Sequence, residues 1–374
     1  MYKLIRPLIF TQNSEMMHNL TLWLGENVLG HAPFRQIVSS IYQYDHPALS
    51  QEFLGIKFKN PVGVPGGFDK SARALDFWPA MGLGFIEIGS VTALGGKGNP
   101  KPRMWRLPED LAVVNRMGLN NIGADAMEKK LAARLSLGRI CGIPVGINIA
   151  KTHSKEILAE KGVEDYCYSF KKLHRFGDYI LINVSCPNTA EGKTFEECTA
   201  LEALLSEIKK IRDSEKITKP VLVKVSPDIS FKDLDEILAI TEKYATSGYV
   251  IANCAHGMRE GLKTPASKLE KIGRGGLSGE PIRQKTTELI RHAYKQLRRP
   301  CIIGLGGIDS AEDTYEKIKA GASLVQVLNG LIYEGPGLPK KINKGLVKLL
   351  QRDGFKNIAE AVGTCVPPHQ TIGA

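Results

Sequence analysis

The sequence predicts an α/β protein, a (β/α)8 TIM barrel with an N-terminal helical extension. Eight short runs from residue 60 onward are apolar on both faces, as the strands of a buried parallel sheet are. Helical patterns such as "ALEALLSEIKKIRD" and "AEDTYEKIKAGA" alternate with them, and eight strand–helix units close into a barrel. A doubly wound sheet is the alternative. The runs are "PVGVPGG" (61–67), "GFIEIGS" (84–90), "PVGINIA" (144–150), "DYILINVS" (178–185), "PVLVKVS" (220–226), "GYVIANC" (248–254), "PCIIGLG" (300–306) and "SLVQVLN" (323–329).

The stretch before the first run predicts helices. From Ser14 the apolar residues recur at helical spacing, Asn13 or Ser14 can cap the helix, and Gly30 ends it. A second helix is expected over Phe34 to Tyr42. Two readings are open: a helical hairpin docked on the core, or an amphipathic pair lying in a membrane surface. We divide the chain into an N-terminal helical extension, 1–45, and a barrel domain, 46–374.

The amino-acid composition limits the kinds of molecule that the protein is expected to bind. The chain has 374 residues, 43% of them hydrophobic, and a formal net charge of +11. A basic surface suits nucleic acid, an anionic membrane or an acidic substrate, but no Lys/Arg block is long enough for a nucleic-acid arm, so we expect no nucleic-acid partner. No run approaches the ~20 apolar residues of a membrane-spanning helix.

The seven cysteines are scattered singly along the chain. No CxxC pair occurs, so we expect no zinc or iron–sulfur site and no bound metal. A dispersed, odd set in a chain of this size indicates free thiols in a reducing compartment. The cysteines are Cys141, Cys167, Cys186, Cys198, Cys254, Cys301 and Cys365.

Polar residues cluster where the predicted strands end, which is where a barrel of this kind has its active site. Amides and lysines there could bind a flat polar heterocycle. The glycine loops "GLGGIDS" (304–310) and "NGLIYEGPG" (329–337) follow the last two strands, where barrels often bind phosphate. The combination suggests FMN. The strand-end residues are Asp69, Lys70, Ser90, Asn148, Asn183, Cys186, Asn188, Lys224, Asn253 and Asn329.

On its motifs the chain resembles the dihydroorotate dehydrogenases from end to end. The helical N-terminus and the segment "KPRMWRLPED…NRMG" resemble the membrane-associated, quinone-reducing class. The matching motifs are "GGFDK" (66–70), "FIEIGSVT" (85–92), "NPKPRMWRLPED" (99–110), "VNRMGLNN" (114–121), "GINIAK" (146–151), "NVSCPNT" (183–189), "VKVSPD" (223–228), "GGLSGEP" (275–281), "IIGLGGIDS" (302–310) and "AGASLVQVLNG" (320–330).

The resemblance implies oxidation of (S)-dihydroorotate to orotate in pyrimidine synthesis, with a hydride passing from C6 to FMN, a proton from C5 to an enzyme base, and electrons to a quinone. It places FMN against Gly66, Gly67, Asp69, Ser90, Asn148, Asn183, Lys224, Gly279, Gly307, Leu328 and Asn329. The substrate positions are Lys70, Asn115, Arg116, Met117, Gly118, Leu119, Asn183, Asn188, Asn253 and Cys254. The quinone candidates are His18 and Arg106.

The base is expected to be Cys186. The quinone-reducing class has serine at this place, whereas cysteine is typical of the soluble class. A thiol, with an unperturbed pKa near ~8.5, needs less help than a hydroxyl to accept a proton. The alternative is a cysteine that only packs beside Pro187. Ser185 lies one residue earlier on an extended strand and would point the opposite way, so we interpret its hydroxyl as structural.

Other departures bear on the electron acceptor. A leucine at position 119 is typical of the soluble class, and Leu328 stands where the quinone-reducing class has a tyrosine near the flavin. Arg106 could instead be a surface partner of Glu109 or Asp110. Quinone remains the expected acceptor; a fumarate-type soluble acceptor and a flavin-binding paralogue without this activity are the alternatives. We expect peripheral association with the cytoplasmic side of a cell inner membrane, because no mitochondrial presequence is visible.

Overall fold

The computed structural model describes residues 2–185, 194–297 and 301–367. It contains a closed barrel of eight parallel strands, which confirms the TIM barrel and excludes the doubly wound sheet, because the last strand pairs with the first (Val325 with Val62). Each strand overlaps one of the eight predicted runs. Around the barrel they are β3 (Val62–Asp69), β4 (Phe85–Val91), β7 (Val145–Ile149), β8 (Tyr179–Asn183), β9 (Val221–Val225), β10 (Gly248–Ile251), β12 (Ile302–Leu305) and β13 (Leu324–Gln326).

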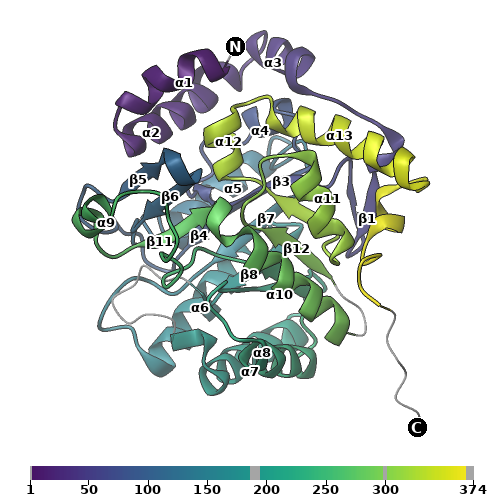
Figure 1. Ribbon diagram of the computed structural model, residues 1–374. Helices are drawn as coiled ribbons and strands as arrows, with labels where there is room; N and C mark the ends of the chain where they lie inside the picture. The colour runs from purple at the N-terminus through teal and green to yellow at the C-terminus, as the bar shows by residue number, and fades with distance from the viewer. Residues whose placement is uncertain (1, 186–193, 298–300, 368–374) are drawn as a thin grey trace.

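Helices surround the barrel (Figure 1). Local signals define their ends: Ser230 caps α8 and Ser310 caps α11, in each case by accepting a hydrogen bond from the backbone N–H three residues later. Gly354, in a left-handed conformation, ends α13. The helices are α4 (Phe77–Ala80), α5 (Ala124–Leu135), α6 (Ala159–Leu173), α7 (Cys198–Ser214), α8 (Phe231–Lys243), α9 (Ala266–Ile272), α10 (Arg283–Gln296), α11 (Ala311–Lys319), α12 (Asn329–Glu334) and α13 (Leu338–Asp353).

The barrel interior is layered. Its lower part is an apolar cluster that includes Leu181, Leu222 and Leu324. A hairpin of β1 (Gln51–Phe53) and β2 (Ile56–Phe58) closes the N-terminal end with Phe53 and Phe58. Because alternate strand residues share a face, the residues two positions beyond those leucines also point inward. They are polar: Asn183, Lys224 and Gln326. With Asn148 of β7 they form what we call the polar layer, at the C-terminal end of the barrel.

A second sheet, which no pattern in the sequence predicts, covers part of this end. It is antiparallel and consists of β5 (Met104–Leu107), β6 (Ala112–Asn115) and β11 (Gly276–Gly279). Each of its strands is only four residues long, and β11 joins β6 from more than 150 residues away, so no local alternation of apolar and polar residues marks the sheet. The sheet lies between the barrel and the N-terminal helices (Figure 1).

The N-terminal helices gather at one end of the molecule, beside α12 (Figure 1). Helix α2 (Ser14–Leu24) runs into a π-helical turn, η1 (Gly25–Leu29), and ends at Gly30 as predicted; Asn13 supplies the cap. Helix α3 (Phe34–Tyr42) is also as predicted. Helix α1 (Tyr2–Thr11) was not predicted. It is anchored on α12, because the Tyr2 hydroxyl donates to the Ile332 carbonyl at 2.6 Å.

A buried ion pair joins α2 to the loop before β5. Arg103 Nη2 lies 2.8 Å from Glu15 Oε1, and both side chains are buried. Burial disfavours the charged carboxylate, but the hydrogen bonds and charges of Arg103 and Lys101 outweigh it and hold the pKa of Glu15 below its ordinary value. The extension is therefore attached to the barrel domain partly by charge.

We expect Glu15→Gln to destabilise the protein by somewhat less than the roughly 3–5 kcal/mol that loss of one partner of a buried pair costs, because glutamine still accepts a hydrogen bond. Since the folded pKa of Glu15 is depressed, its contribution is complete above the unfolded pKa and is lost as pH falls through the folded value. Thermal unfolding at several pH values tests this: the difference from wild type should shrink in acid. The exposed pair Glu207–Lys210 gives the control, because Glu207→Gln should change little at any pH. An equal effect of the two substitutions would contradict the prediction.

Candidate active site

One continuous cavity of about 440 Å³ begins at the polar layer and extends between the barrel and the N-terminal helices. Barrel-side residues such as Lys70, Asn183 and Lys224 line one part with polar groups. Residues of α1 and α2, among them Phe10 and Met17, line the other with apolar groups. The arrangement can hold a polar ring at one end and an apolar molecule at the other.

Most of the predicted site residues line this cavity. Three do not: the side chains of Asp69, Arg116 and Asn148 are held elsewhere or lie behind its wall. Cys186 and Asn188 lie outside the described residues. Those that line the cavity are Gly66, Gly67, Ser90, Asn183, Lys224, Gly279, Gly307, Leu328 and Asn329 of the flavin set, Lys70, Asn115, Met117, Gly118, Leu119, Asn183, Asn253 and Cys254 of the substrate set, and both quinone candidates, His18 and Arg106.

Asp69 organises the turn after β3 instead of facing the cavity. Its buried carboxylate accepts hydrogen bonds from the backbone N–H groups of Arg73 and Ala74, at 2.7 and 2.8 Å, and from Trp78 Nε1 at 3.1 Å. The next residue, Lys70, lines the cavity. Asp69 therefore fixes the backbone that presents Lys70, which the sequence motif could not distinguish from ligand contact.

Arg116 is directed away from the cavity although its neighbours line it. Its guanidinium stacks on Trp105, 4.4 Å from the ring centroid, and donates to the carbonyl of Arg274 at 2.9 Å. These contacts tie the loop after β6 to the segment before β11. Four residues of the run 115–119 therefore line the cavity, whereas Arg116 supports the loop that carries them.

Asn183, at the end of β8, and Asn253, two residues after β10, are held in place by one another. Asn183 Nδ2 donates to Ser90 Oγ at 2.9 Å, and Asn253 Nδ2 lies 3.3 Å from Asn183 Oδ1. The Ser185 hydroxyl is buried, donates to Asn183 Oδ1 at 3.2 Å and lies 3.1 Å from Asn253 Nδ2. The network orients the amides before any ligand arrives, and Ser185 belongs to this support.

Two fully buried amides of the polar layer have no partner. Neither the nitrogen nor the oxygen of Asn148 or of Gln326 has a hydrogen bond among the described residues. Each unpaired buried polar group costs about 1–3 kcal/mol. Asn148 lies against Gly66, where a Cβ would come within 2.8 Å of its Nδ2. Such amides fit a ligand that offers both donors and acceptors.

Gln326 was missed in the sequence analysis although it lines the cavity. It lies inside the run "SLVQVLN", whereas the predicted site residues come mainly from the ends of the runs. Its position two residues after Leu324, an interior residue, is the signal that could have identified it.

Two of the glycines predicted to contact FMN are required by close packing. At Gly307, with φ of 65°, a Cβ would lie 2.3 Å from Arg283 Cβ. At Gly279, with φ of 109°, it would lie 2.4 Å from the Leu111 carbonyl oxygen. Neither position accommodates a side chain, so the backbone itself forms this part of the cavity wall.

The quinone candidates lie at the boundary between the two parts of the cavity. His18 is half-buried beside Phe68, with ring centroids 4.9 Å apart. Burial lowers the pKa of His18 to about 3, with a contribution from the charge of Lys70, so its imidazole is neutral at physiological pH.

Arg106 joins the second sheet to the N-terminal helices. It donates to Ser14 Oγ at 3.0 Å and to the Ile9 carbonyl at 3.1 Å, and its guanidinium lies 4.6 Å from the centroid of the Phe10 ring. Asp110, which we had considered as a surface partner for Arg106, accepts hydrogen bonds from Thr264 instead. Arg106 is thus part of the cavity wall rather than of a surface pair.

Comparison with known proteins gives a consistent set of matches. The family model described as dihydroorotate dehydrogenase matches residues 48–350. The chain is 39% identical over 368 residues to the dihydroorotate dehydrogenase (quinone) of Gloeobacter violaceus, covering 97% of this chain and 98% of that protein. It is 39% identical over 363 residues to that of Natronomonas pharaonis, covering 97% and 99%.

The fold is shared with solved structures. The crystal structure of DHODH from Eimeria tenella in complex with ferulenol is similar with a TM-score of 0.83 and 30% sequence identity, covering 95% of this chain and 96% of that one. The ligand-free form of the Eimeria tenella protein gives a TM-score of 0.84 at 30% identity, covering 95% and 99%. Because 95% of this chain is covered in both cases, these matches include part of residues 1–45 as well as the barrel.

Proposed function

The chain belongs to the dihydroorotate dehydrogenase family, and from this premise we propose that it oxidises (S)-dihydroorotate to orotate in pyrimidine biosynthesis, using FMN and a quinone. The observation that carries the proposal is the near-complete match to quinone-dependent members, at 39% identity over 97% of the chain. The enzyme is accordingly an oxidoreductase of the flavin-dependent kind.

The polar layer supports FMN as the flavin. Gln326 and Lys224 line this end of the cavity, and the Gln326 amide has no hydrogen bond among the described residues; Asn148, with the same unpaired amide, lies behind Gly66. Gly279 and Gly307 would let the backbone approach the phosphate. The chemistry that FMN supplies when bound is acceptance of the hydride from C6 and delivery of the electrons to the quinone. Lys224 would stabilise negative charge that develops on the reduced ring.

The substrate would lie between Lys70 and the asparagines. The ammonium of Lys70 is suited to the substrate carboxylate as a point charge. Asn115, Asn183 and Asn253 line the cavity and supply donors and acceptors for the imide-like edges of the ring, and we assign Asn188 to the same set from its motif. Cys186 is the proposed base, which removes the proton from C5.

The apolar part of the cavity is consistent with a quinone site, and the outer surface of α1 is consistent with contact with a membrane. Leu4 is 84% exposed and Leu8 is 71% exposed on this helix, where a membrane interface would cover them. No helix among the described residues is long and apolar enough to cross a bilayer. We propose peripheral association with the cytoplasmic face of a cell inner membrane, which brings the quinone to His18 and Arg106.

The deciding experiment is a pair of assays on the purified full-length protein. Dihydroorotate should bleach the bound flavin, and a short-chain quinone should reoxidise it and sustain turnover. Cys186 and Leu119 resemble the soluble class, so fumarate is the comparison acceptor. Turnover with fumarate and none with quinone would reassign the acceptor. Purified protein that neither contains nor takes up FMN would refute the proposal.

A further inference from the structure

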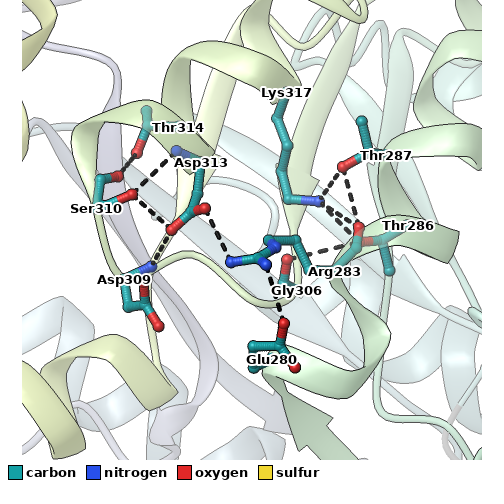
Figure 2. Close-up of polar contacts among 10 residues, drawn as sticks. All are labelled: Glu280, Arg283, Thr286, Thr287, Gly306, Asp309, Ser310, Asp313, Thr314 and Lys317. Carbon is teal, nitrogen blue, oxygen red and sulfur yellow. Dashed lines mark hydrogen bonds and ion pairs between the residues drawn. The ribbon is translucent and has the colours of Figure 1, made fainter. Parts of the chain in front are cut away.

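Lys317 is a buried cation that none of the roles above uses. Its side chain, on α11, is completely buried. Its Nζ donates to Thr286 Oγ1 at 2.7 Å, to Thr287 Oγ1 at 2.9 Å and to the Arg283 carbonyl at 3.2 Å (Figure 2). All three acceptors are neutral. A buried charge whose direct contacts are all neutral is unfavourable by several kcal/mol.

Two carboxylates beside this cluster are paired with the Arg283 side chain. Arg283 Nη1 pairs with Asp313 Oδ1 at 3.0 Å, and Arg283 Nη2 pairs with Glu280 Oε1 at 2.9 Å (Figure 2). Burial lowers the pKa of Lys317 to about 7; the charges of Glu316 and Asp313 oppose the shift and that of Arg283 adds to it. Without a further anion, the lysine is balanced between its charged and neutral forms near physiological pH.

Lys317 lies directly behind the glycine loop that lines the cavity. A Cβ at Gly304 would be 3.6 Å from Lys317 Cδ, so the stem of the lysine passes beneath the end of β12. Thr286, which the ammonium contacts, also lies 3.5 Å from the Gly306 carbonyl oxygen, and a Cβ at Gly306 would be 3.0 Å from it. Gly306 and Gly307 line the cavity. One threonine therefore separates the ammonium from the proposed phosphate loop.

We propose that Lys317 is a positioning residue for the flavin phosphate: its buried ammonium, behind Thr286, favours a dianion in the Gly306–Gly307 loop, and the bound dianion keeps the lysine protonated. This inference rests on the proposed function, because it assumes that FMN occupies the cavity. Binding would draw a proton from solution in proportion to the fraction of Lys317 that is neutral beforehand.

Because phosphate binding favours the protonated form of Lys317, the affinity for FMN should depend on pH. A phosphate monoester is fully ionised above about pH 7, since its second pKa is about 6. Lys317 in the flavin-free protein loses its proton as pH rises through about 7, whereas with FMN bound it should do so at higher pH. The affinity for FMN should therefore fall as pH rises from 7 to 9.

Asp309 is the other group in the cluster that titrates in this range. Burial and the neighbouring Asp313 raise the pKa of Asp309 to about 7. Its ionisation would add negative charge beside the loop and also weaken phosphate binding as pH rises. Asp309→Asn removes this contribution, so any pH dependence that survives in that variant belongs to another group.

The test compares FMN with riboflavin, which has the same ring but no phosphate. Flavin-free full-length protein is titrated with each at pH 7 to 9, and binding is followed by quenching of flavin fluorescence. Lys317→Met should bind FMN about fivefold or more weakly near pH 7, with riboflavin binding unchanged, because a one-unit rise in the Lys317 pKa gives a factor of ten for the fully charged lysine and about half of that when half of it is neutral beforehand. Its FMN affinity should lose most of its pH dependence, and Asp309→Asn should retain it.

Two controls distinguish loss of the Lys317 charge from a defect in folding. Replacing a buried charge with an apolar residue of similar volume is often neutral or stabilising, so Lys317→Met should unfold at or above the wild-type temperature. Lys317→Gln, which keeps a donor but no charge, should repeat the FMN defect. Equal losses for FMN and riboflavin, or wild-type FMN binding by both variants, would overturn the inference. Failure of the wild-type protein to bind either flavin would instead refute the proposed function.

Discussion

Cys186→Ala is expected to reduce its flavin about 100-fold or more slowly than the wild-type enzyme, while still binding orotate. A positioned general base contributes roughly 10²–10⁴-fold to proton transfer, and an alanine side chain cannot accept a proton. The measurement is stopped-flow reduction of the bound flavin by dihydroorotate with no electron acceptor present, which isolates this half of the reaction. Wild-type reduction should rise with pH and level off above the pKa of the thiol.

Two variants show whether the effect belongs to the base. Cys186→Ser should keep more activity than alanine and shift its profile to higher pH, because a hydroxyl is harder to deprotonate. Cys254 is the matched control: it lines the same cavity, but burial raises the pKa of its thiol, which is therefore unsuited to be a base. Cys254→Ala should retain the wild-type pH profile. A fast alanine variant at position 186 with an unshifted profile would show that another group takes the proton.

Removal of residues 1–45 is expected to abolish quinone turnover and to leave flavin reduction by dihydroorotate intact. The polar layer and the asparagine network belong to the barrel, whereas α1 and α2 supply the apolar wall of the cavity, including Phe10, Met17 and His18. Without that wall the quinone has no site. Flavin content, stopped-flow reduction and steady-state turnover with a short-chain quinone test the three parts separately.

A double substitution separates the quinone site from the membrane surface. Leu4→Ser with Leu8→Ser changes only exposed side chains of α1 and leaves the cavity wall in place. This variant should retain turnover with a short-chain quinone in solution but lose it with a long-chain quinone held in lipid vesicles, because membrane binding scales with buried apolar area. Undiminished short-chain turnover in the truncated protein would place the quinone site outside the extension.

Much of the architecture follows from sequence alone, for a physical reason. Parallel strands buried on both faces must be apolar throughout, so eight such runs are visible without any knowledge of their pairing. Polar residues at the ends of those runs, such as Asn183 and Lys224, converge because all strands of a parallel barrel end at the same face. The motifs predicted which face carries the site, and the sequence offered Asn13 or Ser14 as the cap of α2, of which the structure uses Asn13.

Only the tertiary structure decided which residues of a motif face the cavity. Asp69 and Arg116 stand in the same motifs as Lys70 and Asn115, yet backbone donors hold the first and Trp105 holds the second. Gln326 joins the site because its strand turns it inward, and Lys317 because α11 packs behind the loop of β12. Short strands such as β11 and the helix α1 acquire their structure from partners more than 150 residues away. Local periodicity determines where a chain forms strands and helices, but hydrogen bonds and packing between distant segments determine where each side chain points.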